Sequence, residues 1–239
     1  MGNVRVLLCA ILLITTSFAQ VSQTHPAAAN IISFISDPNT DHIRLYWKDG
    51  DGNVLGSIKK LKSFIEIKNN NLIFAMNGGM YKADHTPQGL FILDKKLLTS
   101  LDTSPGTGNF YMQPNGVFYL KPNGIAGVCK SNDFVNKDIV YATQSGPMLV
   151  FDGAINSAFK KGSENLNIRN GVGILPDGKV VFAISRERIN FYDFAMYFKS
   201  LGCRNALYLD GFVSRAYLPK EGFEQLDGDF GVMIAVTDK

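Results

Sequence analysis

The chain has 239 residues, with 24 Lys or Arg and 21 Asp or Glu, which gives a formal net charge of +3 at pH 7. This near balance excludes the strongly basic footprint of a nucleic-acid-binding protein. Only three His residues are present and no CxxC pair occurs, so neither a metal site nor another cofactor is expected. The length suits one large domain or two small ones, and no Pro/Ser-rich linker divides it.

Residues 1–19 have the pattern of a secretory signal peptide. Arg5 precedes an apolar run over residues 6–14, and Ser17 and Ala19 supply the small residues of a cleavage site. The run is too short for a stable membrane anchor, and no second run approaches membrane length. We therefore predict an exported protein, periplasmic or extracellular and without stable membrane insertion, whose remaining residues 20–239 form a single domain.

Apolar runs between turn signals predict many strands and few helices. The spacing of apolar residues predicts helices over 57–66 and 191–201. Turns rich in Pro, Asn, Asp and Gly at 121–124, 152–153 and 175–178 predict hairpins. Strands are expected at 43–47, 72–76, 90–93, 117–120, 125–128, 148–151, 171–174, 180–184, 206–209 and 230–236. The predicted class is α/β, or α+β-like, with a β-rich mixed sheet and one βαβ unit near the C terminus.

Two segments in the first half of the chain carry candidate binding groups. The run DGDGN at 49–53 resembles a calcium loop, but Val54 and Lys60 replace the Gly and Glu that an EF-hand needs, which favours an exposed turn. Asn77, Gly78 and Gly79 follow a predicted strand, where paired glycines let a ligand approach the backbone. A tight turn with positive φ accounts for these glycines equally well.

Further polar residues lie in the central part of the chain. Gln144 and Ser145 precede a predicted strand in a loop fixed by Gly-Pro, and are either binding groups or turn formers. Arg169 is the single cation of NLNIRN at 165–170, followed by Asn170. Its guanidinium suits phosphate or carboxylate recognition, with a surface charge or a structural ion pair as the alternative. Cys129 and Cys203 are either disulfide-bonded or two free thiols.

The segment 180–217 predicts a strand, a helix and a second strand. Asn190 is a candidate N-cap for the helix, and Asp193 stands three residues later, where a capping interaction explains it. A βαβ crossover makes its two strands parallel. The C-terminal ends of the strands then share one rim, where ligands bind in such sheets, and the rim carries Ser185, Arg186, Asp210 and Ser214.

Asp210 is the strongest catalytic candidate on this rim. It ends a buried strand, where a carboxylate without partners would be costly, so it is either satisfied by backbone N–H groups or chemically active. A serine hydrolase is disfavoured, because no GxSxG motif is present and the His residues occur in polar or N-terminal contexts.

Six motifs taken in order resemble the phosphodiester glycosidase family, the family of the lysosomal uncovering enzyme. They are NGGMY (77–81), PQGL (87–90), QSGPMLVFDG (144–153), IRNGVGILPDG (168–178), FYDFAMYFKSLGC (191–203) and NALYLDGFVS (205–214). The resemblance implies a mixed α/β fold, hydrolysis of a glycosyl-1-phosphodiester, and one pocket faced by Asn77, Arg169, Asp210 and Ser214. Phe212 and Val213 replace glycines common in the family, which resembles a bacterial exported subgroup.

The chemistry needs few groups, because a phosphomonoester is a far better leaving group than a sugar hydroxyl and protonation is less necessary. Asp210 would activate water or stabilise an oxocarbenium ion, and Arg169 would hold the departing phosphate. The expected substrate-binding residues are Asn77, Gly78, Gly79, Gln144, Ser145, Asn170, Arg186 and Ser214. The predicted partner is an envelope or extracellular glycan. A non-catalytic glycan-binding or envelope-scaffold protein that uses the same cleft is the alternative.

Overall fold

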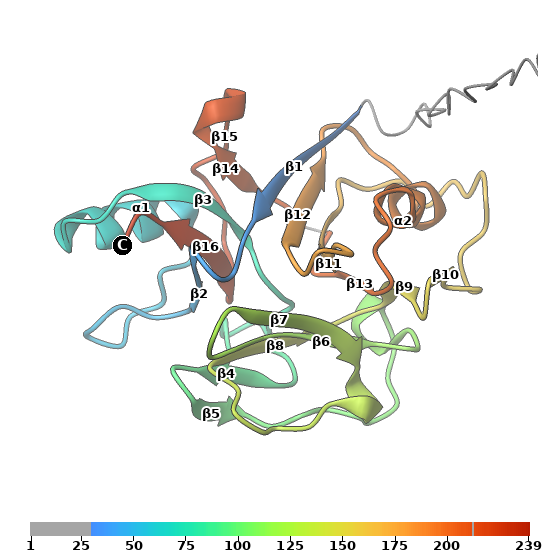
Figure 1. The fold of residues 1–239 in the computed structure, drawn as a ribbon, viewed down its shortest axis with the longest axis horizontal. Coiled ribbons are helices and arrows are strands. Elements are labelled where there is room, and N and C mark those ends of the chain that lie inside the picture. The colour runs from blue at the N-terminus through green and yellow to red at the C-terminus, as the bar shows by residue number, and fades with distance from the viewer. Residues whose placement is uncertain (1–29, 212) are drawn as a thin grey trace, which may run out of the picture.

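The computed structural model describes residues 30–211 and 213–239, so the signal peptide predicted over 1–19 lies outside the described residues. In the described part the strands form three sheets (Figure 1). The first has the order β1 (Ile31–Ser36), β12 (Val180–Ser185), β11 (Asn170–Ile174), β13 (Ala206–Tyr208), β9 (Met148–Phe151), β10 (Ala154–Ile155). The second is β15 (Phe223–Glu224), β14 (Ala216–Leu218), β3 (Leu72–Asn77), β16 (Met233–Thr237), β2 (His42–Tyr46). The third is β5 (Lys96–Thr99), β4 (Phe91–Leu93), β8 (Tyr141–Ser145), β6 (Gly116–Lys121), β7 (Ile125–Lys130).

The three predicted hairpins are confirmed. They connect β6 to β7, β9 to β10, and β11 to β12, each as an antiparallel pair. At the turn from β9 to β10, Asp152 and Gly153 both have positive φ, 53° and 81°. Two successive positive φ angles match the right-handed twist of a hairpin, which is why Asp-Gly occupies this turn.

The β-rich class with few helices is confirmed, and the described pairings between strands are all antiparallel where a mixed sheet was expected. Strands β12 and β13 each pair antiparallel with β11, so they run in the same direction, as the βαβ prediction requires. However, β11 lies between them, because its tight hairpin to β12 gives it the neighbouring position. The C-terminal ends of β12 and β13 still lie at one end of the sheet.

The two helices of the described region each cover one sheet (Figure 1). Helix α1 (Ile58–Ile67) begins at the N-cap Ser57 and packs its buried face against β3 and β16. Helix α2 (Phe191–Ser200) begins at Asn190 and packs its aromatic face against β9, β12 and β13. Neither helix is long and apolar enough to cross a membrane.

Aromatic side chains from the different sheets meet in the central core. Phe74 of β3 stacks on Phe34 of β1 and on Phe182 of β12, with ring centroids 4.7 and 5.2 Å apart. Phe118 of β6 then meets Phe182 edge to face at 5.9 Å. Contacts of this kind add to the burial of large apolar surfaces, so one cluster joins all three sheets.

The fold shows the state of the calcium-like segment and of the two cysteines. Asp49 accepts hydrogen bonds from the backbone N–H groups of Asp51 and Asn53, which makes the calcium-like segment a turn. Within the described residues, His, Cys, Asp and Glu side chains form no group of three that could hold a metal. Cys129 and Cys203 are free thiols, and burial raises their pKa values to about 11 and about 12.

The N-cap of α2 provides a test of the local sequence signal. Asn190 Oδ1 accepts the Asp193 N–H at 2.9 Å, and Asn190 Nδ2 donates to the Asp193 carboxylate at 2.8 Å. We expect Asn190→Ala to lower the free energy of unfolding by about 0.5–2 kcal/mol. Asp193→Ala keeps the cap and should cost less, about 0.3–1 kcal/mol. Urea denaturation measures both, with exposed Glu164→Ala as the control, and a larger loss for Asp193→Ala would contradict this assignment.

Candidate functional site

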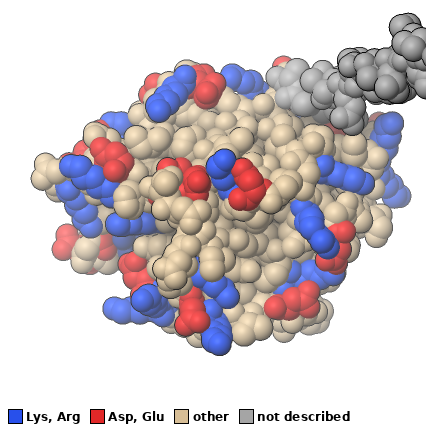
Figure 2. All heavy atoms as spheres, viewed as in Figure 1, with Lys and Arg blue, Asp and Glu red and all other residues tan. Residues whose placement is uncertain are grey.

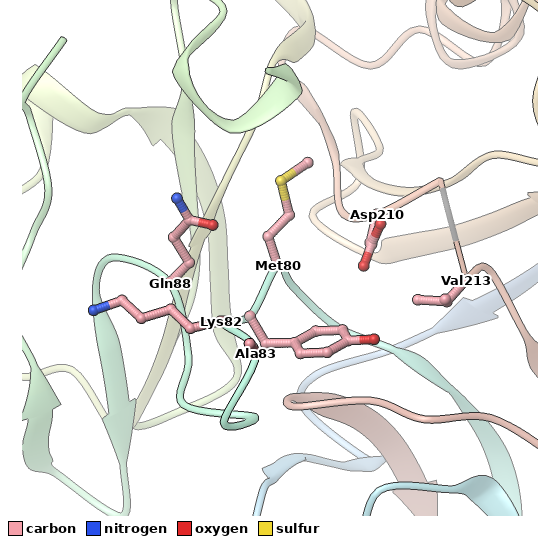
Figure 3. Close-up of a pocket in the computed structure, with 7 residues that line it drawn as sticks. Met80, Lys82, Ala83, Gln88, Asp210 and Val213 are labelled. Atoms are coloured by element: carbon pink, nitrogen blue, oxygen red, sulfur yellow. The ribbon is translucent and has the colours of Figure 1, made fainter. Parts of the chain in front are cut away.

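A pocket of about 320 Å³ opens where the segment after β3 meets the end of β13. Figure 3 shows Asp210 and Val213 on one side of it, with Lys82 and Gln88 on the opposite side. The volume lies at the lower end of the range of about 300–1,000 Å³ for small-ligand sites. The lining residues are Met80, Tyr81, Lys82, Ala83, Gln88, Asp210 and Val213.

Asp210 reaches the pocket because the backbone around it is fixed. The Leu209 N–H donates to the Asn170 carbonyl at 3.2 Å, and the Asp210 N–H donates to Asn170 Oδ1 at 2.9 Å. The Ser214 hydroxyl donates to the Asp210 carbonyl from the other side. Because both the N–H and the carbonyl of Asp210 are hydrogen-bonded, its side chain is directed into the pocket (Figure 3).

The carboxylate charge of Asp210 acts on two neighbouring phenols. Burial, followed by the charges of Asp210 and Asp229, raises the pKa of Tyr81 to about 12. Burial also raises the pKa of Tyr208, where the positive charge of Arg169 acts in the opposite direction to that of Asp210. Both phenols are therefore neutral at physiological pH and can act as hydrogen-bond donors but not as bases.

Two buried amides beneath the pocket join two sheets. Asn170 Nδ2 donates to the carbonyl and to the Oδ1 of Asn77, at 2.9 and 2.8 Å. Asn77 Oδ1 also accepts the Arg215 N–H at 2.9 Å. Two donors therefore fix the orientation of the Asn77 amide, whose Nδ2 has no protein hydrogen-bond partner among the described residues. Asn77 and Asn170 are brought together below Asp210, and neither lines the pocket.

Gly78 and Gly79 are buried and serve a close approach of three strands. Gly78 donates its N–H to the Val232 carbonyl at 2.8 Å, and neither glycine has positive φ. A Cβ at Gly79 would lie 2.5 Å from the Thr143 hydroxyl. The glycines therefore let the end of β3 pass between β16 and β8, and the alternative of a tight turn with positive φ is wrong.

Gln144 and Ser145 lie in β8 and not in the expected loop, and they bind the third sheet to neighbouring segments. Gln144 Oε1 accepts the N–H groups of Leu90 and Asp102, both at 2.9 Å. The Ser145 hydroxyl donates to the Leu209 carbonyl at 2.6 Å, one residue before Asp210. Both side chains are buried and neither lines the pocket, so in this structure they support its walls.

Arg169 is fully buried and lies outside the pocket lining. Its Nε donates to the Ile189 carbonyl at 2.8 Å, and its Nη2 donates to the Asn165 carbonyl at 2.9 Å. The guanidinium lies 3.5 Å from the centre of the Phe191 ring and 5.5 Å from that of Tyr208, and burial lowers its pKa. Its Nη1 has no protein partner among the described residues. These contacts favour a structural role for Arg169, and the phosphate-binding role predicted from the sequence is tested by the substitution described below.

The remaining rim residues, Ser214 and Arg186, lie in different surroundings. Ser214 is buried and donates to the Asp210 carbonyl, so it supports the site. Arg186 is exposed at the end of β12, and its guanidinium lies 5.4 Å from the Phe223 ring of β15. Arg186 therefore points to the edge of the second sheet and is not among the pocket-lining residues.

Sequence reasoning missed Tyr81, Lys82 and Gln88 as pocket residues. Tyr81 and Gln88 are part of the NGGMY and PQGL motifs, and Lys82 follows directly. The signal that could have found them is the short spacing of these two motifs, which form one tight loop. In that loop the Gln88 N–H donates to the Met80 carbonyl at 2.9 Å and the Lys82 N–H donates to the Thr86 carbonyl at 2.9 Å.

Comparison with known proteins now identifies the chain. A family model described as phosphodiester glycosidase matches residues 70–230, which include the complete pocket lining. The chain belongs to the phosphodiester glycosidase family. An uncharacterised Escherichia coli K12 protein, YigE, is 35% identical over 209 residues, which cover 87% of this chain and 82% of YigE.

Two solved structures share the fold of this chain. The catalytic domain of zebrafish N-acetylglucosamine-1-phosphodiester alpha-N-acetylglucosaminidase, auto-inhibited by its pro-peptide, matches with a TM-score of 0.57 and 17% identity. That match covers 90% of this chain and 86% of the zebrafish chain. A Burkholderia pseudomallei protein described as exported matches with a TM-score of 0.58 and 11% identity, over 86% of this chain and 73% of that one. Family and fold are those of a glycosidase-type hydrolase.

The buried position of Arg169 gives a prediction about its role. In Arg169→Lys, one ammonium cannot reproduce the paired contacts to the Ile189 and Asn165 carbonyls. We expect the free energy of unfolding to fall by about 1.5–3 kcal/mol. Any loss of kcat/KM should be equal for a phosphodiester and for an aryl glycoside with a neutral leaving group. A loss confined to the phosphodiester, at unchanged stability, would instead place Arg169 at the phosphate.

Proposed function

We propose that this chain hydrolyses the bond between a sugar and a phosphate in a glycosyl-1-phosphodiester. The observation that supports this most is that Asp210 lines a pocket of about 320 Å³ in a chain of the phosphodiester glycosidase family. Among the described residues of the pocket lining, Asp210 is the single carboxylate and Lys82 the single cation. A substrate whose reacting carbon is next to an anionic leaving group fits this pair of charges.

The proposed step uses Asp210 as the base. Asp210 takes a proton from water while the water oxygen forms a bond to the anomeric carbon. The bond between that carbon and the phosphate oxygen breaks, and the phosphomonoester leaves with the electron pair. The products are a free sugar and a phosphomonoester. Because the departing phosphate is already a good leaving group, no second carboxylic acid is required to protonate it.

Lys82 is the proposed contact for the leaving phosphate. Its side chain is exposed, and Figure 3 shows it with Gln88 on the side of the pocket opposite Asp210. An ammonium is a compact charge on a flexible stem and binds phosphate as a point charge. The amide of Gln88 adds a hydrogen-bond donor on the same side, where its Nε2 lies 3.3 Å from the Tyr111 hydroxyl.

The comparisons and the N-terminal sequence suggest the sugar and the cellular setting. N-acetylglucosamine, which appears in the name of the zebrafish relative, is the first sugar to test. The signal-peptide pattern of residues 1–19, together with the Burkholderia relative described as exported, supports an envelope or extracellular glycan as the substrate. Figure 2 shows positive and negative side chains interspersed over the visible face, which suits a soluble glycan better than a polyanion.

Replacing the proposed base tests its role. Asp210→Asn keeps the backbone bonds to Asn170 and Ser214 but removes the carboxylate, so turnover of a glycosyl-1-phosphodiester should fall by about a hundred- to ten-thousandfold. Release of free sugar measures turnover, and thermal unfolding verifies the fold. Asp177→Asn, in the exposed turn between β11 and β12, is the matched control. A purified wild type that binds sugar without any turnover would instead favour the glycan-binding or scaffold protein.

Replacing Lys82 tests its contact with the leaving phosphate. Lys82→Met should lower kcat/KM for the phosphodiester by about tenfold, because a charge-assisted contact to phosphate is lost. An aryl glycoside with a neutral leaving group should be nearly unaffected. Lys137→Met, an exposed lysine outside the pocket lining, controls for general loss of positive charge. An equal loss on both substrates would remove Lys82 from the phosphate site.

A further inference from the structure

Tyr81 forms part of the pocket wall, and contacts with His85 and Asp229 hold its ring in place. The ring of Tyr81 stacks on the imidazole of His85, with centroids 5.5 Å apart and planes 8° from parallel. The Tyr81 hydroxyl donates to the Asp229 carbonyl, and His85 Nε2 lies 2.6 Å from the Asp229 carboxylate. A single residue, Asp229, therefore holds both rings of the stack.

The main chain around this stack is also fixed. The indole N–H of Trp47 donates to the His85 carbonyl at 2.9 Å, and His85 adopts a left-handed φ of 63°. A Cβ at Gly231 would lie 2.5 Å from the Tyr81 Cβ and 2.9 Å from the His85 carbonyl oxygen. The segment that carries Asp229 and Gly231 thus passes directly against Tyr81, and only a glycine fits at position 231.

Global stability does not account for the pairing of His85 with Asp229. The Asp229 side chain is 80% exposed and that of His85 is 27% exposed. A contact so open to solvent on its carboxylate side contributes little to the free energy of unfolding. What the contacts do accomplish is to fix the plane of an aromatic ring that lines the pocket next to Asp210. A wall fixed before binding requires no ordering when a ligand arrives.

The chemistry of Tyr81 indicates what that ring offers. Its hydroxyl is engaged by the Asp229 carbonyl, and its raised pKa of about 12 keeps it protonated. The hydroxyl is therefore already engaged, and the part of Tyr81 that can contact a ligand is the flat apolar face of its ring. The C–H face of a six-membered sugar ring is flat and apolar in the same way, while the hydroxyl groups of the sugar stand around its edge.

We propose that Tyr81 is the wall against which a pyranose ring of the substrate stacks, and that Asp229 and His85 are positioning residues that hold this wall. The inference rests on the proposed function for the identity of the ligand as a sugar. It adds the way in which the sugar binds at the same pocket, through the C–H face of its ring.

Trp47 supplies a readout that does not depend on catalysis. It is the only tryptophan of the chain, and its indole is hydrogen-bonded to the loop that carries Tyr81 and His85. Titration of the Asp210→Asn protein with N-acetylglucosamine, glucose and galactose should change the Trp47 emission and give a Kd for each. In that background, Tyr81→Leu should raise the Kd of the sugar that binds by about tenfold, and Tyr81→Phe by less than about threefold.

The positioning pair is tested with Asp210 intact. Asp229→Ala removes the partner of His85 and should raise KM for the phosphodiester about three- to tenfold with little change in kcat. Asp227→Ala is the matched control, because Asp227 is an exposed acid on the same loop that pairs with Arg215 instead. It should leave KM unchanged. Melting temperatures within about 2 °C of the parent verify that the fold is intact.

Failure of this inference differs from failure of the proposed function. An unchanged sugar Kd in Tyr81→Leu, or an equal loss in Tyr81→Phe, overturns the stacking wall even if the wild type hydrolyses phosphodiesters. A KM unchanged by Asp229→Ala overturns the positioning role. Sugar binding that depends on the Tyr81 ring in a wild type without turnover supports the wall and overturns the hydrolase. If none of the three sugars binds, the inference is overturned.

Discussion

The side-chain amide of Asn170 is the contact on which the site depends. Its Nδ2 donates to the main chain and side chain of Asn77, and its Oδ1 accepts the N–H of Asp210. An amide has a donor end and an acceptor end, so one buried side chain satisfies groups on two different sheets. The end of β3 and the residues after β13 are thereby set at a fixed separation. The loop 80–88 and Asp210 form the pocket across that separation.

Most polar side chains around the pocket support it from behind. Gln144, Ser145 and Arg169 direct their polar atoms to backbone groups of neighbouring segments. Buried polar atoms need such partners, because an unsatisfied one costs about 1–3 kcal/mol. The aromatic cluster centred on Phe182 joins the three sheets beneath them. The pocket therefore rests on a rigid frame, and its chemistry is left to Asp210 and one short loop.

Two opposite charges act on the buried phenol of Tyr208. Asp210 lines the pocket, and the guanidinium of Arg169, outside the lining, lies 5.5 Å from the Tyr208 ring. Arg169 is also covered by Phe191, so its positive charge is held by carbonyl oxygens and aromatic faces. A guanidinium is suited to this setting, because it is flat and more weakly hydrated than an ammonium. The accessible cation of the pocket is Lys82 instead.

The sequence by itself determined the features that depend on neighbouring residues. Asp152-Gly153 defines a hairpin, Asn190 begins a helix, and the order of six motifs identifies the phosphodiester glycosidase family. It also singled out Asp210, because a carboxylate at the end of a buried strand is costly unless it has partners or a chemical role. Only the tertiary structure decided that β11 separates β12 from β13, that Arg169 turns inward, and that the loop 80–88 supplies the opposite wall. The physical reason is that a polar side chain points to whichever distant backbone group satisfies it, and periodicity and spacing along the chain do not encode that partner.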